Sequence, residues 1–312
     1  MGAQVIQGGA EPGVHNDDRL IDLGDIRAAV EQRLATLIDL RSTVPDNLRA
    51  ALRHALLGQS KRVRPVMMLM IAEPRDALVG PVLDVGCAVE MVHTASLILD
   101  DLPCMDDATL RRQRPATHIA FGQPTAILSA VALLTRAFGI IAALDDVPAS
   151  TRTRLASVLA NAIGWDGLVA GQEIDINNRA SLHDAEQVEH LNWLKTGVLF
   201  VAAAEMGAIF RGLESERLEA VRRFARHFGL AFQTADDLLD RTDTAGQAGK
   251  DVGQDDDKPT LVSLFGVSHA RLTCQQHLTH AEQALVDSGV SAAPFRALMM
   301  WLFGACQRGS PL

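Results

Sequence analysis

The chain has 312 residues, of which 48% are hydrophobic and 21% charged, and its formal net charge is −9 at pH 7. This composition is typical of a globular protein with a large core. The acidic balance argues against a nucleic-acid binder, whose affinity depends on neutralising phosphates, and against a polybasic membrane anchor. The cysteines have neither metal-binding spacing nor a dense disulfide framework, so we expect reduced thiols and a cytoplasmic location.

Residues 1–20 lack the basic start and long apolar run of a signal peptide. We expect them to be a mobile leader, and residues 21–312 to form a single domain. The most apolar segment, residues 126–144, is interrupted by Arg136 and Gly139 and is marginal in length for a bilayer span. We therefore expect no membrane span, and interpret this segment as a buried helix that can serve a subunit interface.

Helical periodicity dominates the whole chain, and stretches that alternate apolar with polar residues are few. Clusters of Pro, Gly, Ser and Asp separate the helical segments, but none is long enough to link two domains. The pattern predicts a single all-α domain of roughly ten helices. These lie near residues 22–42, 46–57, 63–73, 79–107, 124–144, 151–178, 184–211, 214–244, 268–288 and 291–306.

The stretch LILDDLPCMDDATLRR places four aspartates among apolar residues near the end of the predicted helix 79–107. Carboxylates in such a setting must line a cavity or meet a cation, because burying them unpaired is costly. On a regular helix Asp100 and Asp106 would lie about 120° apart around the axis. Pro103 interrupts the helical hydrogen bonds, and we expect a local bulge there to turn Asp106 back towards Asp100.

A second aspartate cluster, in FQTADDLLD, follows another apolar helical stretch. Asp236 and Asp240 are four residues apart and share a helix face, with Asp237 beside them. One such motif is weak evidence. Two of them in an all-α chain predict two helices that face each other across a cavity with carboxylates at its mouth.

Oxygen ligands without His or Cys suit Mg²⁺, which usually completes its shell with water and substrate phosphates. The two motifs therefore predict a site where bridging metal ions hold a diphosphate. An EF-hand calcium site fits poorly, because DRTDTAGQAGKD lacks that loop's ligand order.

An anionic substrate also needs basic side chains, and these lie next to both acidic motifs. Arginine binds phosphate oxygens through two N–H groups, and lysine supplies a compact charge. Each basic group alone would more often be a solvated surface; beside the aspartates it favours phosphate binding. The candidates are Lys61, Arg62 and Arg64 in GQSKRVRP, Arg111 and Arg112 after the first motif, and Lys250 and Lys258 after the second.

Four further polar residues have two open interpretations. His93 lies two turns before Asp100 on the same helix face, and Lys195, Thr196 and Gln233 interrupt apolar helices. Each is either a paired core residue or part of the site.

Taken together, DDLPCMDDATLRR, GQSKRVRP, LKTG, FQTADDLLD and GKDVGQDDDKPT resemble the short-chain trans-isoprenyl diphosphate synthases, most closely the bacterial geranylgeranyl diphosphate synthases of carotenoid pathways. The resemblance covers about residues 20–305, and the motifs occur in the family's order. It implies an all-α bundle around a deep central cavity, a homodimer, and a Mg²⁺-dependent head-to-tail condensation of isopentenyl diphosphate with an allylic diphosphate. Two departures are Gln113, where the family often has Gly, and the longer GQSKRVRP form of the basic motif.

The resemblance also implies residue roles and three Mg²⁺ ions per active site. Catalysis falls to Asp100, Asp106, Asp236, Lys195 and Arg111. The expected metal ligands are Asp100, Asp101, Asp106, Asp236, Asp237 and Asp240. Isopentenyl diphosphate is expected at Lys61, Arg64, His93 and Arg112, and the allylic diphosphate at Arg111, Lys195, Thr196, Gln233, Lys250 and Lys258.

Product length is expected to depend on helix positions four, five, eight and nine residues before Asp100: Ser96, Ala95, Val92 and Met91. In the family, a bulky aromatic residue five positions before the first Asp stops growth at fifteen carbons. Ala95 is small, which implies a twenty-carbon product with Met91 near the cavity floor; the alternative is that Ala95 only allows tight packing.

Three other functions stay open at this point. A farnesyl diphosphate synthase would stop one unit earlier. A class I terpene cyclase would lack the basic KRVRP segment and carry a different second metal motif, and a non-catalytic partner subunit would have lost an acidic motif. This chain retains the basic KRVRP segment and both aspartate motifs.

Overall fold

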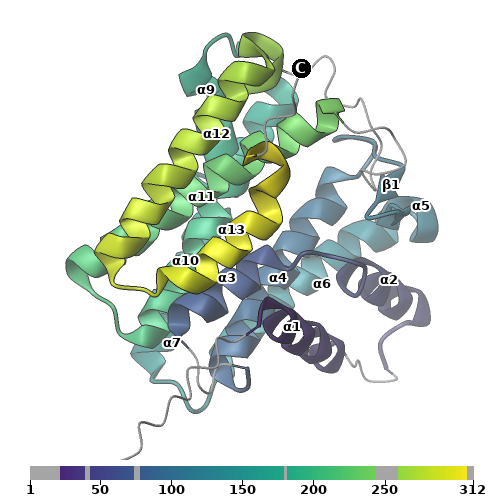
Figure 1. The fold of residues 1–312 in the computed structure, drawn as a ribbon. Helices are drawn as coiled ribbons and strands as arrows, with labels where there is room; N and C mark the ends of the chain where they lie inside the picture. Colours follow the sequence, from purple (N-terminus) through teal and green to yellow (C-terminus); the bar gives the residue numbers. More distant parts are fainter. Residues whose placement is uncertain (1–21, 39–42, 74–77, 179–180, 243–258, 308–312) are drawn as a thin grey trace, which may run out of the picture.

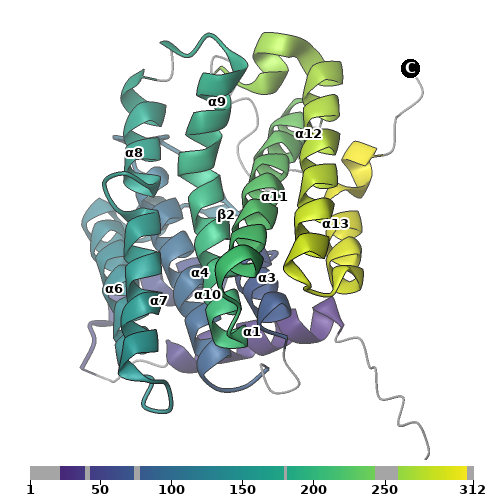
Figure 2. The same cartoon turned by 90° about the vertical axis from the view of Figure 1, so that its left-hand side faces the viewer.

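The computed structural model describes residues 22–38, 43–73, 78–178, 181–242 and 259–307, and the side chains of these except 240–242 and 305–307. The expected leader, residues 1–20, lies outside the described residues. The described chain is an α-helical bundle, as predicted (Figure 1). Most helices run side by side, and α1 crosses one end of the bundle (Figure 2).

Helices account for nearly all regular structure in the described ranges. The α-helices are α1 (Leu23–Leu37), α2 (Asp46–Leu56), α3 (Val63–Ala72), α4 (Pro81–Asp100), α5 (Thr117–Phe121), α6 (Gln123–Ala142), α7 (Ala149–Ile163), α8 (Leu168–Glu173), α9 (Ala185–Asn192), α10 (Val198–Arg211), α11 (Ser215–Thr242), α12 (Leu261–Ser288) and α13 (Ala292–Gln307). Two π-helical turns, η1 (Ile174–Asn178) and η3 (Trp193–Gly197), continue α8 and α9. A short antiparallel ribbon pairs β1 (Leu110–Arg111) with β2 (Arg114–Pro115).

The centre of the bundle is formed by α3, α4 and α10, whose residues are largely buried. Every residue of α3 from Val63 to Ile71 is buried, which explains why this segment is apolar on all sides. Gly207 of α10 lets the two helices approach closely, since a Cβ there would lie 2.5 Å from the Met68 carbonyl oxygen. Close packing of this kind fixes the walls on which the site is built.

Several predicted helices differ from the observed ones at their ends. The helix predicted over 79–107 ends at Asp100. The helix predicted over 151–178 breaks between α7 and α8, where a Cβ on Gly167 would lie 2.3 Å from the Ala162 carbonyl oxygen. α12 begins at Leu261 rather than 268, because Thr260 and Ser263 form a capping box, and Gly266 then kinks it with φ 83°.

The apolar segment 126–144 forms most of α6, and its burial is only partial. In the described part of the chain, three helical stretches are long and apolar enough to cross a membrane by length and composition: Pro81–Asp100, Gln123–Ala142 and Ala185–Arg211. Pro81–Asp100 and Ala185–Arg211 lie mostly inside the bundle, but only 39% of the most apolar 18-residue stretch of α6 is buried. Ile127, Leu128 and Val131 are exposed on this helix. The single chain thus leaves one apolar face of α6 uncovered.

Candidate active site

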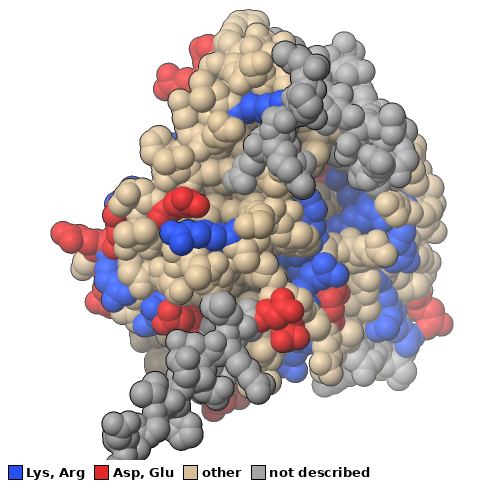
Figure 3. Space-filling model, in the orientation of Figure 1, with Lys and Arg blue, Asp and Glu red and all other residues tan. Residues whose placement is uncertain are grey.

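A cavity of about 1230 Å³ opens between the helices and gathers both acidic motifs with the basic residues. It is lined by Asp100 and Asp106 from the first motif and Asp236 from the second. Lys61, Arg64, Arg111, Arg112 and Lys195 line the same cavity. In the space-filling view, Lys and Arg gather on the side where Figure 1 labels β1 and α2 (Figure 3). The expected convergence of carboxylates and cations is present in one cavity.

The first acidic motif owes its shape to the end of α4. The helix ends at Asp100, and the chain turns back so that the Asp106 amide donates to the Asp100 carbonyl oxygen at 2.9 Å. Asp107 completes the turn with φ 49°. The predicted bulge inside a continuing helix is therefore wrong, because Pro103 follows the helix end instead of interrupting it. The expected consequence, Asp106 lying beside Asp100, is nevertheless found.

Asp101 lies inside the protein and is not among the residues that line the cavity. Arg111 donates to its Oδ1 through Nε at 2.8 Å and also through Nη2. Burial raises the pKa of Asp101, although Arg111 opposes the shift. Burial also opposes the charge on Arg111, but Asp101, Asp100 and Asp106 together outweigh it and raise the pKa of Arg111. Asp101 thus holds a charged guanidinium at the cavity wall.

Lys195 lies on η3 and reaches the first motif from the other side. Its Nζ donates to a carboxylate oxygen of Asp175 on η1 and lies 3.4 Å from Asp100 Oδ1, while Gln172 of α8 donates to the same Asp100 oxygen. Burial opposes the charge on Lys195, but Asp100, Asp175 and Asp106 together raise its pKa. Sequence reasoning missed Gln172 and Asp175. Their only signal is two polar residues, three apart, in the segment GQEID.

α8 can approach η3 this closely because of a glycine. A Cβ on Gly171 would lie 2.7 Å from the backbone nitrogen of Lys195. Any larger residue would separate α8 from η3 and withdraw Gln172 and Asp175 from Asp100 and Lys195. This single position therefore couples the backbone packing to the charge network.

The second acidic motif lies on α11. Asp236 is half-buried and lines the cavity, whereas Asp237 is buried and accepts a hydrogen bond from Gln233 Nε2 at 2.9 Å. Gln233 in turn accepts from Thr196 Oγ1 at 2.8 Å, which links η3 to α11. Asp240 lies in α11, but its side chain is outside the described part of the chain. The predicted roles of Lys250 and Lys258 also fall outside the described residues.

The basic end of the cavity contains a paired arginine and histidine. Arg64 is buried with its guanidinium 4.4 Å from the Phe200 ring centre, and its Nη1 lies 3.2 Å from His93 Nε2. Burial lowers the pKa of Arg64 to about 10. Burial and the neighbouring arginines lower the pKa of His93 well below its usual value. His93 is therefore neutral at pH 7, and Arg64 donates to it.

Lys61 and Arg112 complete the basic end. Lys61 is exposed, with its ammonium 5.9 Å from the Phe232 ring centre. Arg112 Nη2 lies 3.7 Å from Glu90 Oε1. Burial lowers the pKa of Arg112, as do the neighbouring arginines, while Glu90 raises it. Two positive charges thus face the cavity here alongside Arg64.

Arg62, next to these residues, stabilises the fold through buried contacts. Its side chain is fully buried and donates to Glu31, to Glu90 and to the carbonyl oxygens of Leu56 and Gly58. The contacts with the two carboxylates raise the pKa of Arg62 against the effect of burial. Sequence reasoning did not single out Glu90, which accepts from Arg62 and lies near Arg112.

The departure at Gln113 has a conformational meaning. Arg112 and Gln113 form the turn between β1 and β2 with φ values of 54° and 62°. Glycine adopts this left-handed conformation without a steric penalty, and side-chain-bearing residues rarely do. Gln113 is exposed, so the larger residue fits without a clash, at the cost of some backbone strain.

The four residues expected to set product length lie in two environments. Ser96 lines the cavity, together with the apolar side chains of Leu97, Leu99, Leu134, Ile163 and Leu168. Ala95, Val92 and Met91 are fully or almost fully buried in the core cluster and are not among the cavity-lining residues. The residues of α4 that face the cavity pass beside Ala95; they are Glu90, His93, Ser96, Leu97, Leu99 and Asp100.

The donor set fits magnesium. Asp100, Asp106 and Asp236 offer carboxylate oxygens to one cavity, and among the described residues its lining contains neither a cysteine nor, apart from His93, a histidine. Hard oxygen donors beside cationic side chains suit Mg²⁺ bound together with a phosphate-bearing substrate. An apolar wall continues beyond the charged mouth. The fold and site therefore define an all-α enzyme that handles a diphosphate with an apolar tail.

Comparisons with known proteins agree with this class. Residues 45–288 match the family model described as polyprenyl synthetase. A geranylgeranyl diphosphate synthase from Pantoea ananas is 43% identical over 261 residues, which are 83% of this chain and 85% of that one. A farnesyl diphosphate synthase from Geobacillus stearothermophilus is 37% identical over 87% of this chain and 92% of its own length. The crystal structure of a Helicobacter pylori geranyltransferase with magnesium and isoprenyl diphosphate matches with a TM-score of 0.78 and 28% identity, covering 92% of this chain and 98% of that one.

These matches establish the family. The chain belongs to the polyprenyl synthetase family, which is Mg²⁺-dependent, and it is a prenyltransferase, as its sequence motifs predicted.

Proposed function

We propose that this protein condenses isopentenyl diphosphate head-to-tail with allylic diphosphates and releases geranylgeranyl diphosphate. The observation that carries the proposal is the single cavity that joins Asp100 and Asp106 to Asp236, with cations at the charged mouth and an apolar wall beyond. The 43% identity to a geranylgeranyl diphosphate synthase over most of both chains supports the C20 product.

The allylic diphosphate binds at the aspartate end. Asp100, Asp106 and Asp236, with Asp240, are the proposed ligands of three Mg²⁺ ions. When bound, the ions neutralise charge on the diphosphate and stabilise it as a leaving group. Arg111 and Lys195 present additional positive charge, and Thr196 and Gln233 fix the η3–α11 side of the cavity. Of the remaining aspartates, Asp101 holds Arg111 in place and Asp237 anchors Gln233.

Isopentenyl diphosphate binds at the basic end, where Lys61, Arg64 and Arg112 supply the charge and neutral His93 accepts from Arg64. The carbon–oxygen bond of the allylic substrate breaks, and its electron pair leaves with the diphosphate. The isopentenyl double bond attacks the allylic cation, and a new carbon–carbon bond forms. The departing diphosphate takes the proton that the condensed product loses.

Charge placement explains how these residues promote the reaction. Negative charge grows on the leaving diphosphate as the bond breaks, so preorganised cations bind the transition state more strongly than the substrate. The apolar wall formed by Leu97, Leu99, Leu134 and Leu168 excludes water, which would otherwise capture the cation. This is the physical reason for placing carboxylates at the rim of an apolar cavity.

We further propose that the protein is a cytoplasmic homodimer in a pathway that consumes C20 diphosphate, such as carotenoid synthesis. The uncovered apolar face of α6 with Ile127, Leu128 and Val131 supports the dimer, since exposed apolar patches mark contact surfaces. The proposed product-length residues are Ser96 on the cavity wall and Ala95, Val92 and Met91 behind it.

The test is to incubate purified protein with labelled isopentenyl diphosphate, Mg²⁺ and dimethylallyl, geranyl or farnesyl diphosphate. Chain growth that ends at C20 supports the proposal. A C15 end product would identify a farnesyl diphosphate synthase, the activity named for the Geobacillus relative. A hydrocarbon without isopentenyl incorporation would indicate a cyclase, and absence of turnover a non-catalytic subunit.

A further inference from the structure

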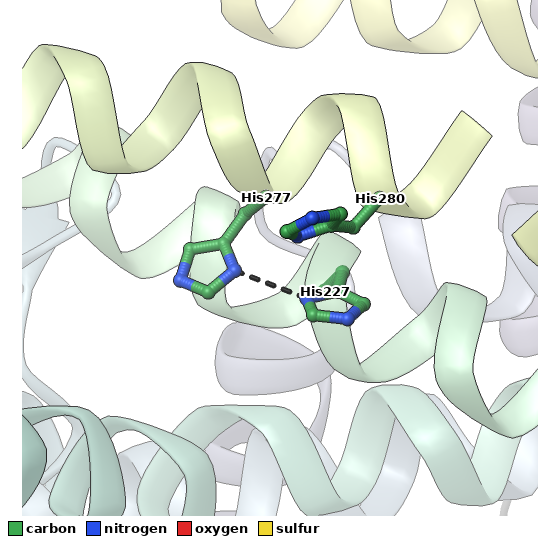
Figure 4. A group of neighbouring side chains, drawn as sticks. All are labelled: His227, His277 and His280. Atoms are coloured by element: carbon green, nitrogen blue, oxygen red, sulfur yellow. Dashed lines mark hydrogen bonds between the residues drawn. The ribbon is translucent and has the colours of Figure 1, made fainter. Parts of the chain in front are cut away.

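Three histidines meet between α11 and α12, in a cluster distinct from the residues that line the active-site cavity. His277 and His280 are three residues apart and project from one face of α12, and His227 projects towards them from α11 (Figure 4). Their potential ligand atoms all lie within 4.8 Å of one another. His227 is half-buried, the His277 side chain is 12% exposed and His280 is exposed, so solvent reaches one side of the cluster.

The spacing of the rings suits a common metal ion. The Nδ1 atoms of His227 and His277 share a hydrogen bond at 3.0 Å, which a bound metal ion would replace, and the ring centres of His227 and His280 are 4.9 Å apart. Two nitrogens bound to one tetrahedral Zn²⁺ at about 2.0–2.1 Å lie about 3.3 Å from each other. The His227–His277 pair is near that separation, and a potential ligand atom of His280 lies within 4.8 Å of both.

A carboxylate is placed to orient the buried ring. Glu189 of α9 has its Oε1 3.7 Å from His277 Nε2. This Nε2 is buried and has no hydrogen-bond partner among the described residues. Metal-binding histidines usually direct their second ring nitrogen to such a carboxylate, which leaves the first nitrogen free for the metal. Here that first nitrogen is Nδ1, the atom that faces His227.

The protonation state agrees with this arrangement. Burial, together with His277, His280 and Arg226, lowers the pKa of His227 to about 4. Arg226 itself lies over the Trp193 ring at 4.8 Å. His227 is thus unprotonated at pH 7, the form in which imidazole binds a metal. Arg226 opposes any added cation, so the three nitrogen ligands must outweigh its charge.

We propose that His227, His277 and His280 form a binding site for a transition-metal ion of the Zn²⁺ class, with Glu189 orienting His277. Nitrogen ligands separate this site chemically from the oxygen-rich magnesium site. An ion here joins α11, which carries Asp236, to α12. Because it binds the folded state, it stabilises the protein in proportion to the logarithm of its concentration over Kd.

The experiment uses Co²⁺ as a spectroscopic probe and Zn²⁺ as a stabilising ligand, on full-length, tag-free protein in excess Mg²⁺. The binding variants are His280→Ala, Glu189→Gln and the double variant His227→Ala/His280→Ala. His269→Ala is the matched control, because His269 is an exposed histidine on the same helix and outside the cluster. Co²⁺ held by aspartates contributes equally to every variant and cancels in the comparison.

We expect one Co²⁺ per chain with the visible absorption of low-coordinate nitrogen ligation in the wild type and in His269→Ala. His280→Ala should weaken this binding at least tenfold, Glu189→Gln should weaken it several-fold, and the double variant should abolish the signal. Zn²⁺ should raise the melting temperature of the wild type and not of the double variant. The proposal is overturned if the wild type and double variant give the same Co²⁺ spectrum and the same Zn²⁺ response. Prenyltransferase activity reports separately on the proposed function, because none of these histidines lines the active-site cavity.

Discussion

Replacement of Asp175 by Asn tests the charge network around Lys195. The change preserves side-chain size and removes a carboxylate that is 1% exposed and accepts from Lys195 Nζ. Complete loss of a buried ion-pair partner costs about 3–5 kcal/mol. Asp100 Oδ1 remains 3.4 Å from the ammonium, and 25% of the Lys195 side chain is exposed. We therefore expect roughly half the full cost, about 1–3 kcal/mol.

This cost has a measurable thermal equivalent. An unfolding entropy of about 2.1 cal/mol/K per residue gives about 0.65 kcal/mol/K for a 312-residue chain. The melting temperature should therefore fall by about 2–5 °C in Asp175→Asn. Because Lys195 loses one of its anchors, kcat should fall about tenfold, against about 10²–10³-fold for Lys195→Met, which removes the charge itself. The KM for isopentenyl diphosphate should not change, because the basic end is untouched.

Asp166→Asn is the matched control, since Asp166 is exposed in the turn between α7 and α8. It should leave the melting temperature and kcat unchanged. Wild-type values in Asp175→Asn would refute the idea that Asp175 holds Lys195. A rise in the KM for isopentenyl diphosphate at constant kcat would show that Lys195 binds isopentenyl diphosphate and would contradict its assignment to the allylic diphosphate.

Arg62→Met leaves Glu90 buried without its main partner and should destabilise the protein by about 3–5 kcal/mol, measured by thermal unfolding; an unchanged melting temperature would contradict the structural role of Arg62. Ser96→Phe places a ring in the cavity and should shorten the product to C15 in the product-length assay. Ala95→Phe should also shorten the product and, because Ala95 is fully buried, should cost about 1–3 kcal/mol; unchanged C20 output from Ala95→Phe would reject its product-length role. In metal-free protein, His227 has a pKa of about 4 against about 6.5 when unfolded. The unfolded state therefore binds the proton first, so stability falls as pH drops from 6.5 to 4, by about 1 kcal/mol after allowance for the half-exposed ring. His227→Gln should remove that part of the pH dependence. Denaturant titrations at pH 5 and pH 7 measure the unfolding free energy, and an equal change between the two pH values in wild type and variant would contradict the assignment to His227.

Much of the fold could be predicted because the signals are local. Periodic apolar residues placed α2, α11 and the continuous helical stretch Ala185–Arg211 close to their observed ends. The errors come from backbone chemistry that a short pattern does not reveal. A capping box at Thr260 starts α12 early, and tight packing at Gly167 divides α7 from α8. α5 and the β1–β2 ribbon were not predicted, because each is very short.

The site shows a similar division. Asp100, Asp106 and Asp236 were found because charged residues in apolar sequence are conspicuous, and the structure brings them to one cavity. Asp101 has the same sequence signal but is turned inward to Arg111. Only the direction of the turn after α4 determines which of these aspartates faces the cavity. Asp175 had no motif of its own, since its role depends on how η1 meets η3.

Ala95 shows how much a helix direction can matter. Counting residues from Asp100 places Ala95 and Ser96 together, one position apart. In the bundle that one position rotates the side chain by about 100°, so Ser96 borders the cavity and Ala95 packs in the core. Periodicity identifies the faces of a helix, and only its neighbours determine which face meets the cavity.

The most direct test is a crystal structure with Mn²⁺ in place of Mg²⁺ and an unreactive allylic diphosphate analogue. Anomalous scattering would locate every ion. We predict ions that contact the diphosphate from both sides, with Asp100 and Asp106 as ligands on one side and Asp236 on the other. Ions confined to one acidic motif, or a diphosphate bound away from all three carboxylates, would contradict this assignment.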